Sequence, residues 1–130
     1  MTIHPTDLPD AETTFLTERH LAALITTRAD GTPHSVPVGF TVHDGVARVI
    51  TSGGSVKVAN VRRNGWATIT QIDGRRWVTI EGPARVLDNP QDVALAVQLY
   101  EQRYRQPREN PQRVVIEVEV QRVMTNSGLR

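Results

Sequence analysis

Three Asp-Gly pairs, at residues 30–31, 44–45 and 73–74, each separate two short runs that are rich in β-branched residues. Asp-Gly between such runs is a strong signal for a tight hairpin turn, because glycine adopts the positive φ angles that these turns need. The chain is therefore predicted to fold back on itself repeatedly as antiparallel strands. The first strands, expected as a meander, are Leu21–Thr27, Pro33–Val42 and Val46–Thr51.

Three further runs complete a predicted set of six strands. They are Trp66–Ile72, Trp77–Leu87 and Arg113–Val123. Short helices are expected over residues 11–20, over Val56–Asn64 and from a cap at Asn89 to Pro107. This pattern predicts a mainly β fold, a six-stranded antiparallel β-barrel, closed or split, with a few helices. We expect one domain over residues 1–130, with residues 1–10 as a loose leader.

Pro37 and Gly39 interrupt one of these runs, which indicates an edge strand, a bulge or a segment that faces a ligand. The last run alternates, so Val114 and its neighbours at even numbers would face the core. Glu117 and Glu119 would then lie on a solvated face, which argues against reading them as a catalytic carboxylate pair.

The charge balance excludes several functions. Fifteen Lys and Arg residues face 14 Asp and Glu residues, a net charge of +1, whereas non-specific nucleic-acid binding needs a clear cationic excess. The chain has no cysteine, and its four histidines lack metal-ligand spacing, so no metal site is predicted. No apolar run approaches the about 20 residues of a membrane span. We expect a cytoplasmic protein without a membrane partner.

Residues 51–57, Thr-Ser-Gly-Gly-Ser-Val-Lys, form the most informative segment. Two glycines let the backbone approach a ligand closely, and the helix that Ser55 would cap offers free N–H groups. Hydroxyl groups and the chain's single lysine, Lys57, complete a candidate phosphate cradle. The spacing differs from that of the P-loop, and an ordinary Gly-Ser loop before a capped helix is the alternative.

Several runs, taken in order, resemble the pyridoxamine-phosphate-oxidase-like superfamily of flavin and deazaflavin proteins. They are LAALITTRADGTPH, VPVGF, TSGGSVK and QIDGRRWVTIEG. The later run QRYRQPRENPQRVVIEV is similar to the actinobacterial reductases that depend on coenzyme F-420. The resemblance implies an FMN-binding-type split barrel, and a homodimer with cofactor sites at the subunit interface.

The resemblance also implies cofactor contacts. The ring edge would meet Val36, Pro37, Val38, Gly39 and Phe40, and the phosphate side would meet Thr51, Ser52, Ser55, Lys57 and Arg63. The opposing hairpin, expected to belong to the other subunit, would add Gln71, Arg76, Trp77, Val78 and Thr79, and Arg105 and Pro107 are further candidates near the mouth. No residue is assigned as catalytic.

The implied activity is a reductase that transfers a hydride from reduced F-420, a deazaflavin, to biliverdin or a similar conjugated tetrapyrrole. An FMN-dependent oxidoreductase and a non-catalytic flavin, deazaflavin or haem carrier are the alternatives. F-420 continues beyond its phosphate into an anionic tail, and Arg62, Arg63, Arg75 and Arg76 are expected to form a cationic groove for it. That expected groove favours F-420 over FMN.

Overall fold

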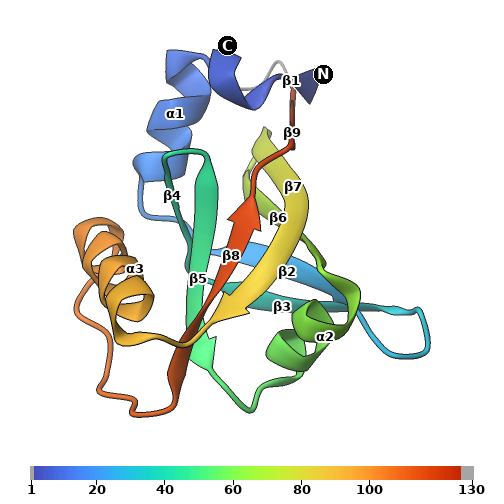
Figure 1. Cartoon of the computed structure of the whole chain (residues 1–130). Helices are drawn as coiled ribbons and strands as arrows, with labels where there is room; N and C mark the ends of the chain where they lie inside the picture. Colours follow the sequence, from blue (N-terminus) through green and yellow to red (C-terminus); the bar gives the residue numbers. More distant parts are fainter. Residues whose placement is uncertain (1, 127–130) are drawn as a thin grey trace.

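The computed structural model describes residues 2–126. Strand-forming runs dominate it, as the turn pattern predicts (Figure 1). The strands are β1 Thr2–Ile3, β2 Ala22–Thr27, β3 Pro33–Val38, β4 Thr41–His43, β5 Val46–Ser52, β6 Trp66–Asp73, β7 Arg76–Leu87, β8 Arg113–Glu119 and β9 Arg122–Thr125. The helices are the 3-10 turn η1 Pro5–Asp7, α1 Asp10–Thr17, α2 Val56–Asn64 and α3 Pro90–Arg103.

The strands join in the order β3-β2-β6-β7-β8-β5-β4, and β9 pairs with both β7 and β1. All pairs are antiparallel. The prediction of six strands is wrong, because the described residues form nine. The strand order does not close, since its two end strands, β3 and β4, do not pair with each other, so the closed form of the expected barrel is also wrong. The sheet instead curls around the core.

The segment predicted as one strand over Pro33–Val42 is divided between the two ends of this order. β3 pairs with β2 and β4 pairs with β5, while Gly39 and Phe40 link them without pairing. The Phe40 side chain is 1% exposed and enters the core, which pulls the chain out of the strand at this point. Pro37 lies on the edge strand β3, as expected of a residue without an N–H group.

β7 connects the two parts of the sheet. Its first half pairs with β6 and β9, and its second half, from Ala84, pairs with β8. The change occurs at Gly82, where the link between β8 and β9 passes directly over the strand. A Cβ atom on Gly82 would lie 1.8 Å from the carbonyl oxygen of Glu119. Only glycine permits this crossing.

The expected half-buried strand over Arg113–Val123 is also divided, into β8 and β9. Residues 114–118 are all buried, so both faces of β8 are covered. The expectation of a solvated Glu117 is therefore wrong. Its carboxylate accepts from Arg48 Nε at 3.3 Å and from Arg85 Nη2 at 3.1 Å. Paired in this way, the charge is held as an internal ion pair.

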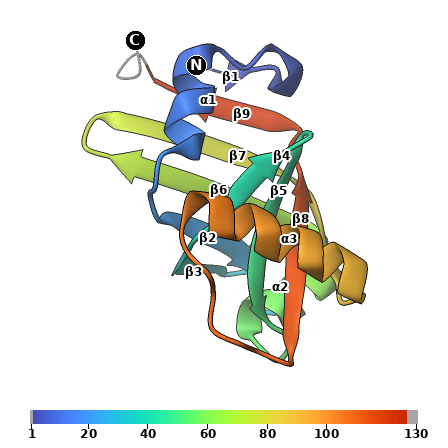
Figure 2. The same cartoon turned by 90° about the vertical axis from the view of Figure 1, so that its left-hand side faces the viewer.

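The helices close the open sides of the sheet. α1 is shorter than the expected helix over residues 11–20, and α3 lies across β5 and β8 (Figure 2). The Asn89 side chain caps α3 by accepting from Asp92 N at 3.0 Å, as predicted. Within the segment expected as a loose leader, β1 pairs with β9. No described helix is long and apolar enough to cross a membrane.

Candidate cofactor site

A cavity of about 310 Å³ lies where the β3–β4 link, β5, α2 and α3 meet. Eleven residues line it: Pro37, Val38, Gly39, Ile50, Thr51, Ser52, Lys57, Tyr100, Pro107, Asn110 and Arg113. Seven of them belong to the set predicted from the sequence, namely Pro37, Val38, Gly39, Thr51, Ser52, Lys57 and Pro107. Segments far apart in the chain therefore line one cavity, which includes Thr51, Ser52 and Lys57 of the expected phosphate cradle.

The start of α2 gives the cavity its polar side. Ser55 is the N-cap residue, as predicted, but its hydroxyl makes no capping hydrogen bond. The Ser55 Oγ atom is buried, and within residues 2–126 it has no hydrogen-bond partner. A buried hydroxyl without a partner is costly. Ser55 itself is not among the residues that line the cavity, so α2 contributes Lys57 to the lining and, at its first turn, free N–H groups suited to an anionic ligand.

Lys57 supplies the charge. Its side chain is half-buried, and burial lowers the pKa of the ammonium group from its ordinary value. Among the described side chains, no carboxylate forms an ion pair with it. Its positive charge is therefore not neutralised within the described part of the chain and is free to pair with an anionic ligand.

The loop after α3 closes the other side of the cradle. Asn110 Nδ2 donates to Ser52 Oγ at 2.8 Å, and the Gly53 N–H donates to the Gln112 carbonyl at 2.9 Å. Arg113 begins β8 opposite Ser52 and adds a second cation to the lining. This arrangement brings two cations, three hydroxyls (those of Thr51, Ser52 and Tyr100) and one amide around a single small space.

Four lining residues were missed by the sequence reasoning: Ile50, Tyr100, Asn110 and Arg113. Tyr100 had a detectable signal, because it follows the apolar stripe of α3 and needs a surface to pack on. That surface is Gly39, where a Cβ atom would lie 3.0 Å from the Tyr100 ring. Asn110 and Arg113 had no local signal, since only the pairing of β8 with β5 places them.

The structure does not bring the other predicted residues into this cavity. Phe40 and Val78 are in the core, and Thr79 is also buried, with its hydroxyl 2.9 Å from that of Thr70. Trp77 is half-buried on β7, and Arg105 is exposed. Val36 lines a neighbouring groove on the outer face of the sheet.

Two predicted ligands are occupied by internal contacts. Arg63 donates to the Thr27 carbonyl and to Asn60 Oδ1, both at 2.7 Å, so it ties α2 to the end of β2. Gln71 is fully buried and donates to the Phe15 carbonyl at 2.8 Å. Within one chain, both residues have structural contacts.

A single chain does not bring together the four arginines that are expected to form the cationic groove. Arg62 and Arg63 lie in α2 just before β6, whereas Arg75 lies in the turn after β6. A strand of eight residues spans roughly 25 Å. Arg76 is held near that turn by Asp73 and by Glu18, and its guanidinium stacks on Phe15 at 4.6 Å.

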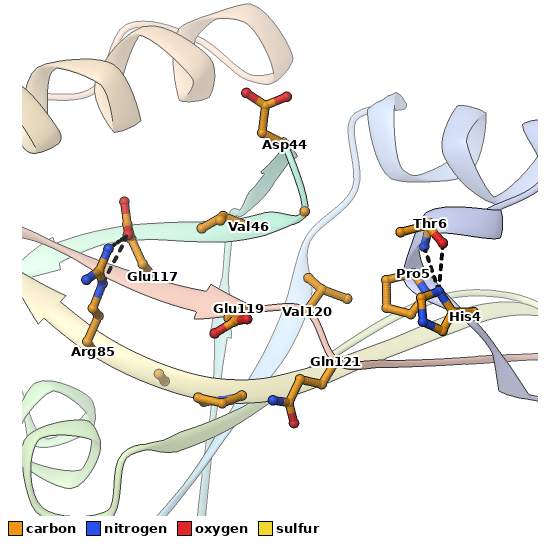
Figure 3. A pocket seen from close by; sticks show the side chains of 13 residues that line it. His4, Pro5, Thr6, Asp44, Val46, Arg85, Glu117, Glu119, Val120 and Gln121 are labelled. Atoms are coloured by element: carbon orange, nitrogen blue, oxygen red, sulfur yellow. Dashed lines mark hydrogen bonds and ion pairs between the residues drawn. The ribbon is translucent and has the colours of Figure 1, made fainter.

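Two other hollows lie outside this site. The larger, of about 880 Å³, runs from the Arg85–Glu117 ion pair to the His4–Thr6 segment (Figure 3). The other, of about 340 Å³, is a groove on the outer face of β3, β2 and β6. Leu21 and Ile72, which are 65% and 64% exposed, line it together with Pro37. Pro37 thus belongs to both this groove and the cavity.

Comparison with known proteins agrees with the fold. Residues 8–127 match the family model described as pyridoxamine 5'-phosphate oxidase. The chain is 51% identical over 126 residues to the F-420H2-dependent biliverdin reductase of Mycobacterium tuberculosis, covering 95% of this chain and 92% of that protein.

Two solved structures share the fold at lower identity. An F-420 reductase has a TM-score of 0.76 at 23% identity, covering 90% of this chain and 98% of that one. A conserved hypothetical protein of Mycobacterium tuberculosis has a TM-score of 0.78 at 23% identity, covering 91% and 84%. With the family model matched over nearly the whole sequence, the chain belongs to the pyridoxamine 5'-phosphate oxidase family.

Proposed function

We propose that this protein is an F-420-dependent reductase whose substrate is biliverdin or a similar conjugated tetrapyrrole. The observation that carries the proposal is Lys57, a half-buried cation in the cavity lining that has no counter-ion among the described residues. A relative with 51% identity that is named for F-420H2 and biliverdin supports this choice of cofactor and substrate.

The donor set fits the phosphate side of such a cofactor. Lys57, Arg113 and the N–H groups at the start of α2 provide positive charge, and Ser52 and Thr51 provide hydroxyls. Gly54 leaves the backbone uncovered, since a Cβ there would meet nothing within 4 Å, whereas Gly53 packs against the Gln112 carbonyl. These groups would bind the phosphate as charge-assisted hydrogen-bond donors.

Pro37, Val38 and Gly39 would line the edge of the ring, opposite Tyr100. Reduced F-420, when bound, supplies a hydride, so the protein's contribution is to orient the reactants and to exclude water. The lining residues include no carboxylate and no imidazole. We therefore assign no catalytic acid, and the proton is expected to come from solvent.

Cofactor titration followed by a turnover assay tests this proposal. The protein should bind F-420 more tightly than FMN, measured by quenching of cofactor fluorescence. With reduced F-420 and biliverdin, bilin absorbance should change as the deazaflavin is oxidised. Tight FMN binding without F-420 binding would favour the FMN-dependent alternative. F-420 binding without its oxidation, across a panel of tetrapyrroles, would favour a carrier.

We also propose that the protein is a homodimer that covers the outer face of β3, β2 and β6. Leu21 and Ile72 are large apolar side chains that lie together and exposed on this face, a typical feature of an association surface. Because Pro37 faces both the groove and the cavity, a second copy here would complete the cofactor site. Sedimentation should give twice the 14.5 kDa chain mass; a single-chain mass at micromolar concentration would contradict it.

A further inference from the structure

Arg103, in the last turn of α3, joins three separate segments of the chain. Its Nε atom donates to the Glu18 carbonyl at 2.9 Å, and Nη1 donates to the Phe40 carbonyl at 2.6 Å. Nη2 donates to the side-chain oxygen of Gln71. The guanidinium also stacks on the Phe40 ring at 4.7 Å and on the Tyr104 ring at 5.2 Å.

All three of these acceptors are uncharged. Among the described side chains no carboxylate forms an ion pair with Arg103, and burial lowers the pKa of its guanidinium from the ordinary value. Burying a cation without a counter-ion costs free energy. An arginine suits this position because its planar guanidinium can direct donors at three acceptors at once.

The contacts continue from Arg103 to the cofactor cavity. The Tyr104 hydroxyl donates to the His20 carbonyl at 2.6 Å and accepts from the Phe40 N–H at 3.2 Å. The centroids of the Tyr104 and Tyr100 rings lie 4.8 Å apart. Both rings pack on Gly39, where a Cβ atom would lie 3.0 Å from Tyr100 and 3.1 Å from Tyr104. Tyr100 and Gly39 line the cavity.

We infer that Arg103 is a positioning residue for this cavity. By holding the end of α3 on Phe40, it sets the separation between Tyr100 and Gly39, and so the width of the space that receives the ring. The inference rests on the proposed function insofar as the ring is that of F-420. Gly39 contributes to the same positioning. It has no side chain, and a Cβ atom there would push against the Tyr100 ring.

The experiment compares Arg103→Met, Arg103→Lys and the remote core variant Val123→Ala, which shares the expected loss of stability but not the location. Amide hydrogen exchange is measured on the cofactor-free proteins, and the Kd for F-420 is measured well below each variant's Tm. Arg103→Met should lose exchange protection in residues 37–40 and raise the Kd about tenfold. Arg103→Lys should recover little, because an ammonium cannot replace the fork.

A double-mutant cycle with Tyr100→Leu tests the route. If Arg103 acts through Tyr100, the two effects should not add. The double variant should then bind F-420 no more weakly than whichever single variant binds it less tightly. Wild-type exchange in residues 37–40 and a wild-type Kd in Arg103→Met, despite a lowered Tm, would overturn the inference. If the wild type binds no F-420, the proposed function fails, and the exchange measurement alone still decides whether Arg103 holds the cavity wall.

Discussion

Replacing Gly82 with alanine should abolish folding or lower the free energy of unfolding by more than about 3 kcal/mol. The new Cβ would lie 1.8 Å from the Glu119 carbonyl oxygen and 3.1 Å from Gln121 N. Both are backbone atoms, so no side-chain rotation relieves the clash. The link between β8 and β9 would have to move away from β7. This would break the hydrogen bond from Gln121 N to the Glu81 carbonyl.

Gly54→Ala is the matched control, because its Cβ would meet nothing within 4 Å and the φ angle of Gly54 is not positive. It should change the free energy of unfolding by less than about 0.5 kcal/mol. Urea denaturation followed by circular dichroism measures both variants. A folded Gly82→Ala protein within about 1 kcal/mol of wild type would show that the β8–β9 link can shift at little cost.

Changing Lys57 to alanine should weaken F-420 binding by about 10- to 100-fold, since a charge-assisted hydrogen bond contributes about 1.5–3 kcal/mol. Stability should not fall in the same way, because the variant removes a half-buried cation that has no counter-ion within the described part of the chain. Fluorescence titration and thermal unfolding measure the two effects separately.

Two control variants and one truncated cofactor isolate the effect of the Lys57 charge. Lys57→Met keeps most of the apolar stem and should bind as weakly as Lys57→Ala, whereas Lys57→Arg should recover part of the affinity. A deazaflavin that lacks the phosphate and the tail should bind wild type and Lys57→Ala equally. If Lys57→Ala and Lys57→Met both bind F-420 like wild type, the phosphate lies elsewhere.

Features that depend on neighbouring residues were predictable from the sequence. The turns at Asp44-Gly45 and Asp73-Gly74 join β4 to β5 and β6 to β7, and Asn89 caps α3. The cradle loop is also local, since two glycines, hydroxyls and Lys57 follow one another in the chain. Because these residues are neighbours in the chain, they could be recognised from the sequence, and they also lie together at the cavity.

Features that depend on distant segments were not predictable. Arg63 looked like a phosphate ligand, but it donates to the Thr27 carbonyl at the end of β2, and also to Asn60 Oδ1 in its own helix. Glu117 looked solvated because its strand alternates, yet Arg48 and Arg85 come from the two strands on either side of it. In both cases the partner is set by strand order, which periodicity does not contain.

The position of Pro37 links two equilibria in the proposed dimer. One face of this residue borders the cavity and the other borders the outer groove, so cofactor and second subunit would each bind better to a chain that already holds the other. By thermodynamic reciprocity, each would raise the affinity of the other by the same factor. Dilution would then release cofactor as it separates the subunits, and the specific activity would fall with protein concentration even at constant cofactor.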